Sequence, residues 1–217
     1  MKKYAMVFDA GTGAGRCNLF DMSGRLVSYA YREWEYLKDL SSSNKEAMLF
    51  DAEQFKKILF SLCRKVITQA GISADEIVAV SATSQREGMV WLDRFGKEIY
   101  AAPSVDLRGE EAADILSGKE PFIKEITGLP VSGMFGLARL LWYKKFNEAV
   151  YDRIDTVMMI SDWICYLLCG SKVSEPSVAS SSQLFDIKNG KWSSELLKSV
   201  GPVSYTHLRA HETTLHL

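Results

Sequence analysis

The sequence predicts an α/β domain with a mixed sheet that opens as an antiparallel meander, followed by a mainly helical part. Short apolar segments separated by glycine turns fill residues 4–30, which is typical of hairpin-connected strands. A helical pattern covers residues 52–70, and strand-like segments return between residues 76 and 102. After Pro103 helical patterns dominate, so we expect a helical insertion there.

The opening meander is expected to have three strands. Residues 4–9 (YAMVFD) predict a buried strand, and residues 16–21 and 25–30 predict two more. Gly24 lies in the turn "MSGR" between the last two, where it supplies a permissive backbone. Residues 32–50 are polar and irregular.

A single amphipathic helix is expected after this irregular segment. Asp51 is its predicted N-cap, with Gln54 three residues later as in a capping box. Gly71 is its predicted C-cap. The apolar residues at helical spacing are Phe55, Ile58, Leu59, Leu62, Val66 and Ile67.

Three further strands should precede the helical part. They are expected at residues 76–84, at 88–93 and, after a turn at Phe95-Gly96, at 97–102. Helices are then expected at residues 108–117, 120–127, 134–149 and 160–169, with a short strand at 154–158. Ser161 or Asp162 is the expected N-cap of the last helix.

Composition excludes several classes of function. The net charge of −1 and the pI of about 6.3 argue against a nucleic-acid partner or a membrane-surface partner. No apolar run approaches the roughly 18 residues of a membrane span. The four cysteines form no CxxC pair, and Cys165 and Cys169, four residues apart, are expected to pack in the core rather than bind a metal. A cytoplasmic enzyme is therefore expected.

The three histidines all lie in the last eleven residues. "HETTLH" lacks the spacing of a metalloprotease motif, because its histidines are five residues apart instead of four. The tail also follows a Gly-Pro break and has no clear apolar period. We expect one domain over residues 1–202 and a non-native tail over residues 203–217.

The segment "FDAGTGAGRCNLFD" (residues 8–21) has a glycine-rich turn after an apolar run, as phosphate-binding loops do. The dinucleotide-binding fingerprint fails, since its third glycine position is Arg16 and a strand-like pattern follows instead of a helix. No Walker motif occurs. A glycine-rich hairpin whose N–H groups bind anions remains, and an ordinary glycine hairpin is the alternative.

In the phosphate-binding interpretation, five residues carry the site. The backbone at Gly11 and Gly13, the Thr12 hydroxyl and the Arg16 guanidinium suit phosphate oxygens. Asp9 would repel bare phosphate, so we expect it to hold Mg²⁺ through water.

The hairpin resembles the first phosphate motif of the FGGY carbohydrate kinases, within the actin-like ATPase superfamily. "VSATSQREGMVWLDRFGKEIY", "SVDLRG", "TGLP", "ARLLWYKK", "MISDWICYLLCG" and "ASSSQLFDIKNGKW" resemble further family segments in the same order. Autoinducer-2 kinases are the most similar members. The resemblance implies a ribonuclease H-like (actin-like ATPase) fold, the cofactors ATP and Mg²⁺, and a small sugar or polyol as substrate.

The resemblance also assigns candidate substrate-binding residues. Arg86 and Glu87 lie between two expected strands, and a guanidinium beside a carboxylate suits hydroxyl groups that both donate and accept. A surface ion pair is the alternative. Similar kinases line the sugar cleft with the segment that contains Asp106 and Arg108; a helix-capping aspartate is the alternative for Asp106.

The sequence departs from glycerol kinases in three places. Ser104 replaces a tryptophan, Met134 replaces a substrate-contacting tyrosine, and Gly13-Ala14 replaces loop hydroxyls. The family's catalytic aspartate lies in a Gly-Gly-Asp-like segment that this chain does not contain, so we expect the chain alone to be inactive. A non-catalytic sugar-binding or regulatory module is the alternative function. The particular substrate and the oligomeric state stay open.

Overall fold

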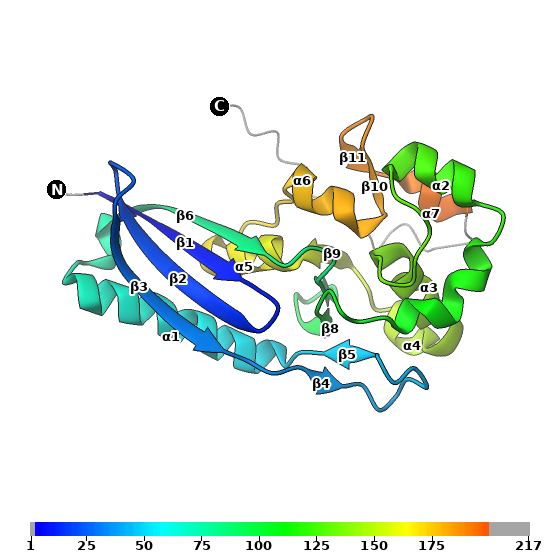
Figure 1. Ribbon diagram of the computed structural model, residues 1–217, viewed down its shortest axis with the longest axis horizontal. Coiled ribbons are helices and arrows are strands. Elements are labelled where there is room, and N and C mark those ends of the chain that lie inside the picture. The colour runs from blue at the N-terminus through cyan, green and yellow to red at the C-terminus, as the bar shows by residue number, and fades with distance from the viewer. Residues whose placement is uncertain (1–2, 200–217) are drawn as a thin grey trace.

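A four-stranded mixed sheet forms one side of the molecule in the computed structural model, which describes residues 3–199 (Figure 1). Strands β1 (Tyr4–Ala10), β2 (Ala14–Asp21) and β3 (Leu26–Glu33) form an antiparallel meander. Strand β6 (Ile77–Ser84) pairs with β1 in parallel, giving the order β3-β2-β1-β6. The predicted mixed sheet and its opening meander are confirmed.

Helix α1 (Ala52–Ala70) covers one face of this sheet and contacts β2 and β3 (Figure 1). Its ends form as predicted: Oδ1 of Asp51 accepts a hydrogen bond from the backbone N–H of Gln54 at 2.9 Å, and Gly71 has a φ of 63°. The face of α1 with Phe55, Leu59 and its other apolar side chains is buried, and these side chains form part of the sheet's core.

A second sheet, of order β8-β7-β9, separates two apolar cores. Strands β8 (Glu98–Ala102) and β9 (Thr156–Met159) both pair antiparallel with β7 (Met89–Leu92). All four side chains of β7 are buried: Val90 and Leu92 belong to the core of the large sheet, and Met89 and Trp91 to that of the helical part. Because successive side chains of a strand point to opposite faces, β7 contributes to the cores of both halves of the molecule.

The helical part follows β8 and occupies the other side of the molecule (Figure 1). Its helices are α2 (Glu120–Thr127), α3 (Gly136–Phe146), α4 (Glu148–Tyr151), α6 (Pro176–Ala179) and α7 (Ser194–Ser199). Helix α5 (Ile160–Cys169) packs instead against the large sheet, mainly on β6. The 3₁₀ helices are η1 (Ala74–Glu76), η2 (Arg108–Leu116) and η3 (Ser180–Ser182). Two short hairpins pair β4 (Leu37–Lys38) with β5 (Met48–Leu49), and β10 (Phe185–Asp186) with β11 (Lys191–Trp192).

Three details of the sequence prediction are wrong. The segment expected to form one helix over residues 134–149 forms α3 and α4, because Asn147 adopts φ −151° and its side chain caps α4. The helix expected at 108–117 is the 3₁₀ helix η2. Helix α5 follows β9 without a loop, so Met159 occupies its N-cap position and neither Ser161 nor Asp162 caps it.

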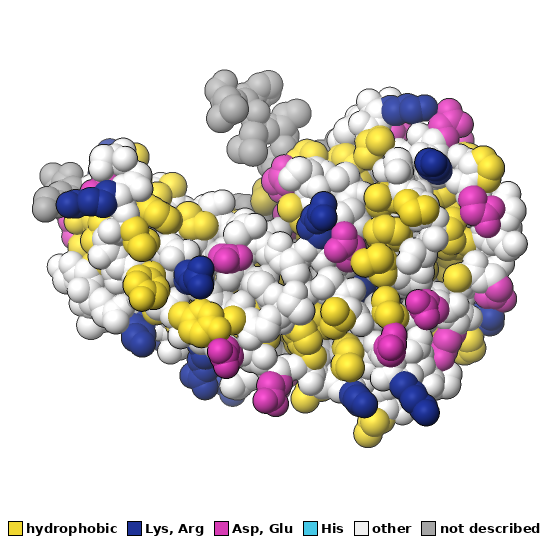
Figure 2. Space-filling view, viewed as in Figure 1, with side chains coloured by type: hydrophobic (Ala, Val, Ile, Leu, Met, Phe, Trp, Pro, Cys, Tyr) yellow, Lys and Arg dark blue, Asp and Glu magenta, His cyan; other side chains and the backbone are white. Residues whose placement is uncertain are grey.

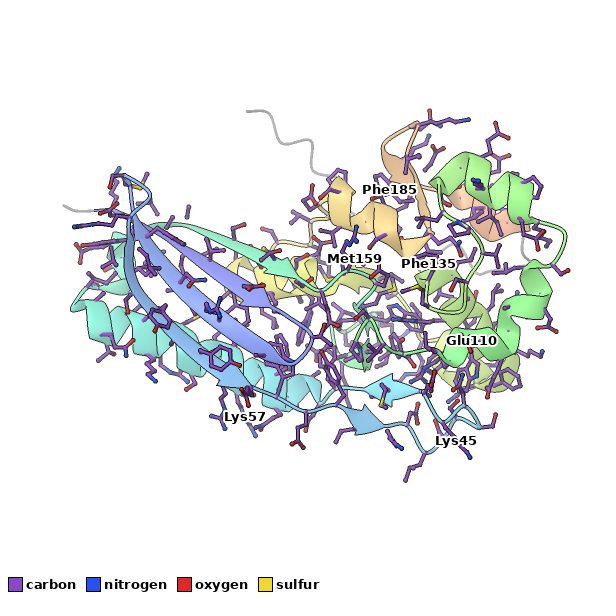
Figure 3. All side chains as sticks on the ribbon, viewed as in Figure 1. Lys45, Lys57, Glu110, Phe135, Met159 and Phe185 are labelled. Carbon is purple, nitrogen blue, oxygen red and sulfur yellow. The ribbon has the colours of Figure 1, made fainter. Side chains whose placement is uncertain are left out.

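The expected core packing of Cys165 and Cys169 holds only in part. Cys165 is half-buried, while Cys169 at the end of α5 is exposed. Within residues 3–199, no cluster of three or more His, Cys, Asp or Glu side chains is arranged to hold a metal ion. In Figure 3, the buried Phe135 and Met159 lie in the middle of the molecule, whereas the exposed Lys57 on α1 lies near its lower edge.

The described helices also bear on the membrane prediction. None of them combines the length and the apolar character needed to cross a bilayer. Over the described part of the face shown in Figure 2, basic side chains are interspersed with acidic ones. The predicted tail, residues 203–217, and the histidines in it lie outside the described residues.

Candidate functional site

Two predicted site segments meet at one edge of the large sheet. Because β1 and β6 run in parallel, both end at this edge, with Ala10 opposite Ser84. The backbone N–H of Gln85 donates to the carbonyl oxygen of Ala10 at 2.8 Å. The hairpin after β1 and the turn after β6, which contains Arg86 and Glu87, therefore lie side by side.

The glycine-rich segment forms a hairpin with no helix beneath it. The N–H of Gly11 donates to the carbonyl oxygen of Ala14 at 2.9 Å, and β2 follows directly. A hollow of about 480 Å³ lies beside this hairpin. Its lining includes four of the five predicted phosphate-site residues, namely Asp9, Gly11, Gly13 and Arg16; the fifth, Thr12, is exposed at the tip of the hairpin. A bound anion can reach the backbone here, since a Cβ on Gly13 would meet no atom within 4 Å.

Trp34 fixes this hairpin, and sequence reasoning missed it. Its backbone N–H donates to the carbonyl oxygen of Gly13 and its indole Nε1–H to that of Thr12, both at 3.1 Å. Its ring packs against Phe55 with 5.0 Å between the ring centres. A Cβ on Gly15 would lie only 2.4 Å from the ring, so this position requires glycine. The signal was a lone tryptophan among charged residues, "REWEY", in a segment interpreted as irregular.

Gln85 connects the hairpin to the segment after β8. Its Nε2 donates to the hydroxyl oxygen of Tyr36 at 2.7 Å and to the carbonyl oxygen of Gly11 at 3.4 Å. Its Oε1 accepts from both the N–H and the hydroxyl of Ser104 at 2.9 Å. Ser104, where glycerol kinases have tryptophan, thus holds Gln85.

Arg86 and Glu87 occupy the turn between β6 and β7, as predicted. Arg86 is exposed and Glu87 is half-buried. Partial burial raises the pKa of Glu87, which the charges of Arg86 and Arg139 partly offset. Glu87 has a φ of 60°, and the next residue, Gly88, could not carry a Cβ without one lying 2.5 Å from Ile160. The turn is held in one backbone conformation.

The structure places Asp106 and Arg108 inside the protein. Both side chains have no exposed surface, and Nε of Arg108 donates to Oδ2 of Asp106 at 2.7 Å. The same oxygen accepts from the hydroxyl of Tyr100 at 2.6 Å. Nη1 of Arg108 donates to Asp39 at 2.7 Å and to the hydroxyl of Tyr143 at 2.8 Å.

These contacts decide between the two interpretations of Asp106 only in part. The N-cap position of η2 is Leu107, without a side-chain hydrogen bond, so Asp106 does not cap a helix. Oδ1 of Asp106 accepts from the N–H of Met48 at 3.1 Å. The sugar-lining role of Asp106 and Arg108 stays a prediction; in this conformation both carboxylate oxygens of Asp106 and two of the three guanidinium nitrogens of Arg108 have protein partners, whereas Nη2 of Arg108 has none among the described residues.

The hairpin hollow suits the predicted cofactors chemically. The Asp9 carboxylate is a hard oxygen donor of the kind that Mg²⁺ prefers, and it lines the same hollow as Arg16 and a second carboxylate, Glu33. Exposed backbone and a guanidinium suit the phosphates of a nucleotide. The donor set therefore fits magnesium bound through water together with phosphate.

Comparison with known proteins identifies the family. Residues 4–210 match the model of the N-terminal domain of the FGGY family of carbohydrate kinases. The chain is 34% identical over 209 residues to the autoinducer-2 kinase of Escherichia coli (strain K12 / DH10B), and 33% identical over 204 residues to that of Salmonella paratyphi B. These matches cover 92% and 91% of the chain but 38% of each relative.

Solved structures agree on the fold. A xylulose kinase from Brucella ovis superposes with a TM-score of 0.83 at 21% identity, covering 96% of this chain and 42% of that one. Glycerol kinase from Plasmodium falciparum, solved with ADP, superposes with a TM-score of 0.81 at 21% identity over 96% of this chain and 43% of its own. The fold is that of the actin-like ATPases, and the chain belongs to the FGGY family of carbohydrate kinases.

Proposed function

We propose that this chain is the substrate-side part, residues 1–202, of a kinase that transfers the γ-phosphate of ATP to a hydroxyl of a small sugar or polyol. The observation that carries the proposal is the meeting of the hairpin after β1 and the turn after β6 at one sheet edge, linked by Gln85. Phosphoryl transfer depends on holding the acceptor hydroxyl near the γ-phosphate, and the candidate residues for both contacts lie at this edge.

The hairpin is assigned to the nucleotide. The backbone at Gly11 and Gly13, the Thr12 hydroxyl and the Arg16 guanidinium would hold phosphate oxygens. Asp9 would hold Mg²⁺ through water, and the ion, when bound, supplies positive charge that offsets the charge of the phosphates. Trp34 keeps the hairpin in place through its bonds to two carbonyl groups of the loop.

The turn after β6 is assigned to the substrate. Arg86 donates and Glu87 accepts, so together they match hydroxyl groups on neighbouring carbons. Asp106 and Arg108 complete the predicted set; because both are buried, we expect them to support the cleft from behind. The similarity to autoinducer-2 kinases favours a small hydroxylated signal molecule of that kind as substrate.

The chain spans about 38% of the length of the curated relatives it matches. The general base for the attacking hydroxyl and the adenosine site are expected in the remaining part, as in similar kinases. Half a cleft cannot hold nucleophile and phosphate in line. We therefore propose that the 217-residue chain alone is inactive. We also propose that the whole protein acts in the cytoplasm on small molecules and that residues 203–217 are not native to the domain.

The test compares the chain with the full reading frame that contains it. The full-length protein is incubated with ATP, Mg²⁺ and a panel of sugars, polyols and 4,5-dihydroxy-2,3-pentanedione, and ADP release is measured in a coupled assay. Turnover with at least one substrate by the full-length protein, and none by the chain, supports the proposal. Turnover by the chain alone would contradict its expected inactivity.

A thermal-shift screen separates a kinase from a sugar-binding module. A ligand that binds the folded state raises the melting temperature by mass action. A polyol that stabilises the full-length protein while no ADP is released indicates the non-catalytic module. Stabilisation together with ADP release indicates the kinase.

A further inference from the structure

Arg139 on α3 is a fully buried guanidinium that donates to backbone rather than to side chains. Its Nη1 donates to the carbonyl oxygen of Glu87 at 2.8 Å, and its Nη2 to that of Ser104 at 3.0 Å. Its side chain has no exposed surface. An arginine carries its donors in a rigid planar fork, so the two bonds fix the distance between the two carbonyl groups.

Its charge is balanced by the buried network next to it. Nε of Arg139 lies 3.9 Å from Oδ2 of Asp106, the carboxylate that also accepts from Arg108. Arg108 in turn pairs with Asp39 at 2.7 Å. Two guanidinium groups and two carboxylates thus neutralise one another, which is the condition for keeping a charged side chain inside a protein. The cluster can keep Arg139 buried without any ligand.

The two carbonyl groups belong to the two candidate substrate segments. Glu87 is the carboxylate of the turn after β6, and its φ of 60° is one that residues other than glycine seldom adopt. The N–H of Glu87 donates to the hydroxyl of Ser181 at 3.4 Å, a weak bond, so the shorter bond from Arg139 is the firmer restraint on this residue. Strained backbone of this kind persists where its surroundings hold it.

We propose that Arg139 is a positioning residue for substrate binding: it holds the Arg86-Glu87 turn at a fixed separation from the Ser104 segment, so that both sides of the sugar site stay in register. The inference rests on the proposed kinase function. Arg139 touches no substrate in this arrangement, and acts through Glu87 and Ser104. Because it donates to backbone, the inference holds whichever side chains contact the sugar.

The first test uses the chain itself and needs no activity. Amide hydrogen exchange of residues 85–88 and 104–106 is measured in Arg139→Lys and in Leu141→Ala, which truncates a buried apolar side chain on the same helix. Lysine offers one point charge and cannot form both bonds. We expect Arg139→Lys to speed exchange in these two segments about tenfold more than elsewhere, whereas Leu141→Ala speeds exchange throughout. Equal effects of both variants on the two segments would overturn the proposal.

The second test uses the full-length kinase and separates sugar from nucleotide. In Arg139→Lys the KM for the sugar should rise about tenfold while the KM for ATP stays within about twofold, since small misplacements of a bound group cost large factors. Arg139→Met, which retains neither bond, should raise the sugar KM further. Leu141→Ala should leave both KM values unchanged. An unchanged sugar KM in Arg139→Met would overturn the positioning role.

The two tests distinguish this inference from the proposed function. If the wild-type full-length protein phosphorylates no sugar, the proposed function fails and the kinetic role of Arg139 fails with it. The exchange measurement still decides whether Arg139 holds the two segments. If the wild type is active and only the Arg139 effects are missing, the positioning role alone is wrong.

Discussion

Two aspartate–arginine pairs were predicted as ligand sites, and the fold treats them in opposite ways. Asp9 and Arg16 stand opposite each other on β1 and β2, beside an open hollow of about 480 Å³. Asp106 and Arg108 have no exposed side-chain surface and donate to or accept from protein groups. The same residue types therefore line an open hollow in one region and form a buried network in the other.

The difference comes from what lies around each pair. Around the hairpin, glycines leave the backbone bare, and the tip of the loop is exposed. Around Arg108, the rings of Tyr100, Trp142 and Tyr143 lie within 5.2 Å of the guanidinium carbon. Aromatic faces and a paired carboxylate together replace water around the charge. The comparison implies that mutations in the buried pair change stability, while mutations at the hairpin change binding.

The largest expected effect is at Arg108. Arg108→Met removes the cation and leaves Asp106 buried with a negative charge that has lost its nearest charged partner. Breaking a buried pair in this way costs about 3–5 kcal/mol. Urea unfolding of the chain, followed by circular dichroism, should show a loss of that size or complete unfolding.

Arg153→Met is the matched control for Arg108→Met. Arg153 also pairs with an aspartate, Asp93 at 3.3 Å, but its side chain is 53% exposed. Exposed pairs contribute about 0–1 kcal/mol. Similar losses in the two variants would show that burial does not distinguish the pairs.

The next largest effect on stability is expected at Asp162, a buried carboxylate with no guanidinium beside it. Burial raises its pKa from the usual 3.8 to about 7. Oδ1 accepts from the N–H of Glu175 at 3.1 Å, and Oδ2 has no hydrogen-bond partner among the described residues. The folded state therefore binds this proton more tightly than the unfolded chain, and the stabilisation it gives is present below about pH 4 and is lost as pH rises to about 7.

Asp162→Asn should remove that pH dependence. A difference of about three pKa units corresponds to on the order of 4 kcal/mol between the two ends of the range. The free energy of unfolding, measured from pH 4 to pH 8 in urea, should fall less steeply in the variant than in the wild type. Parallel curves would show that Asp162 titrates normally.

Local patterns predicted the parts of the fold that depend on nearby residues. The cap at Asp51, the left-handed end at Gly71 and the hairpin after β1 follow from spacing and turn chemistry within a few residues. The break at Asn147 was not predicted, since the apolar pattern continues through it. The cap of α5 was missed because β9 ends directly at the helix, which depends on pairing with β7.

The site shows the same limit. The turn that contains Arg86 and Glu87 was predicted correctly, because both flanking strands were recognised in the sequence. Trp34 and Arg139 could not be predicted, since each donates hydrogen bonds to carbonyl groups more than 20 positions away along the chain. Burial of Asp106 was likewise not predicted, because two of its neighbours, Met48 and Arg139, come from distant segments. Contacts between distant segments have no local signature.

A glycine pair tests how tightly the hairpin is held. Gly15→Ala should cost about 1–3 kcal/mol, because the new Cβ would lie 2.4 Å from the ring of Trp34 and must displace it. Gly13→Ala is the control on the same loop, where a Cβ meets no atom within 4 Å and the change should be near zero. Thermal unfolding measures both. Equal losses would show that Trp34 does not restrain this hairpin.

The smallest expected effect on stability is at Arg16, and it is the most informative about the hairpin. Arg16 is exposed, with its guanidinium carbon 5.8 Å from the ring centre of Tyr31, so Arg16→Ala should change the free energy of unfolding by about 0.5 kcal/mol or less. Arg25→Ala, on the next turn and 80% exposed, should change it as little. In the full-length protein, however, Arg16→Ala should raise the KM for ATP about tenfold, the loss of one charged hydrogen bond, and Arg25→Ala should not. If both leave the KM for ATP unchanged, the hollow beside the hairpin does not hold phosphate through Arg16, and the open pair would be as structural as the buried one.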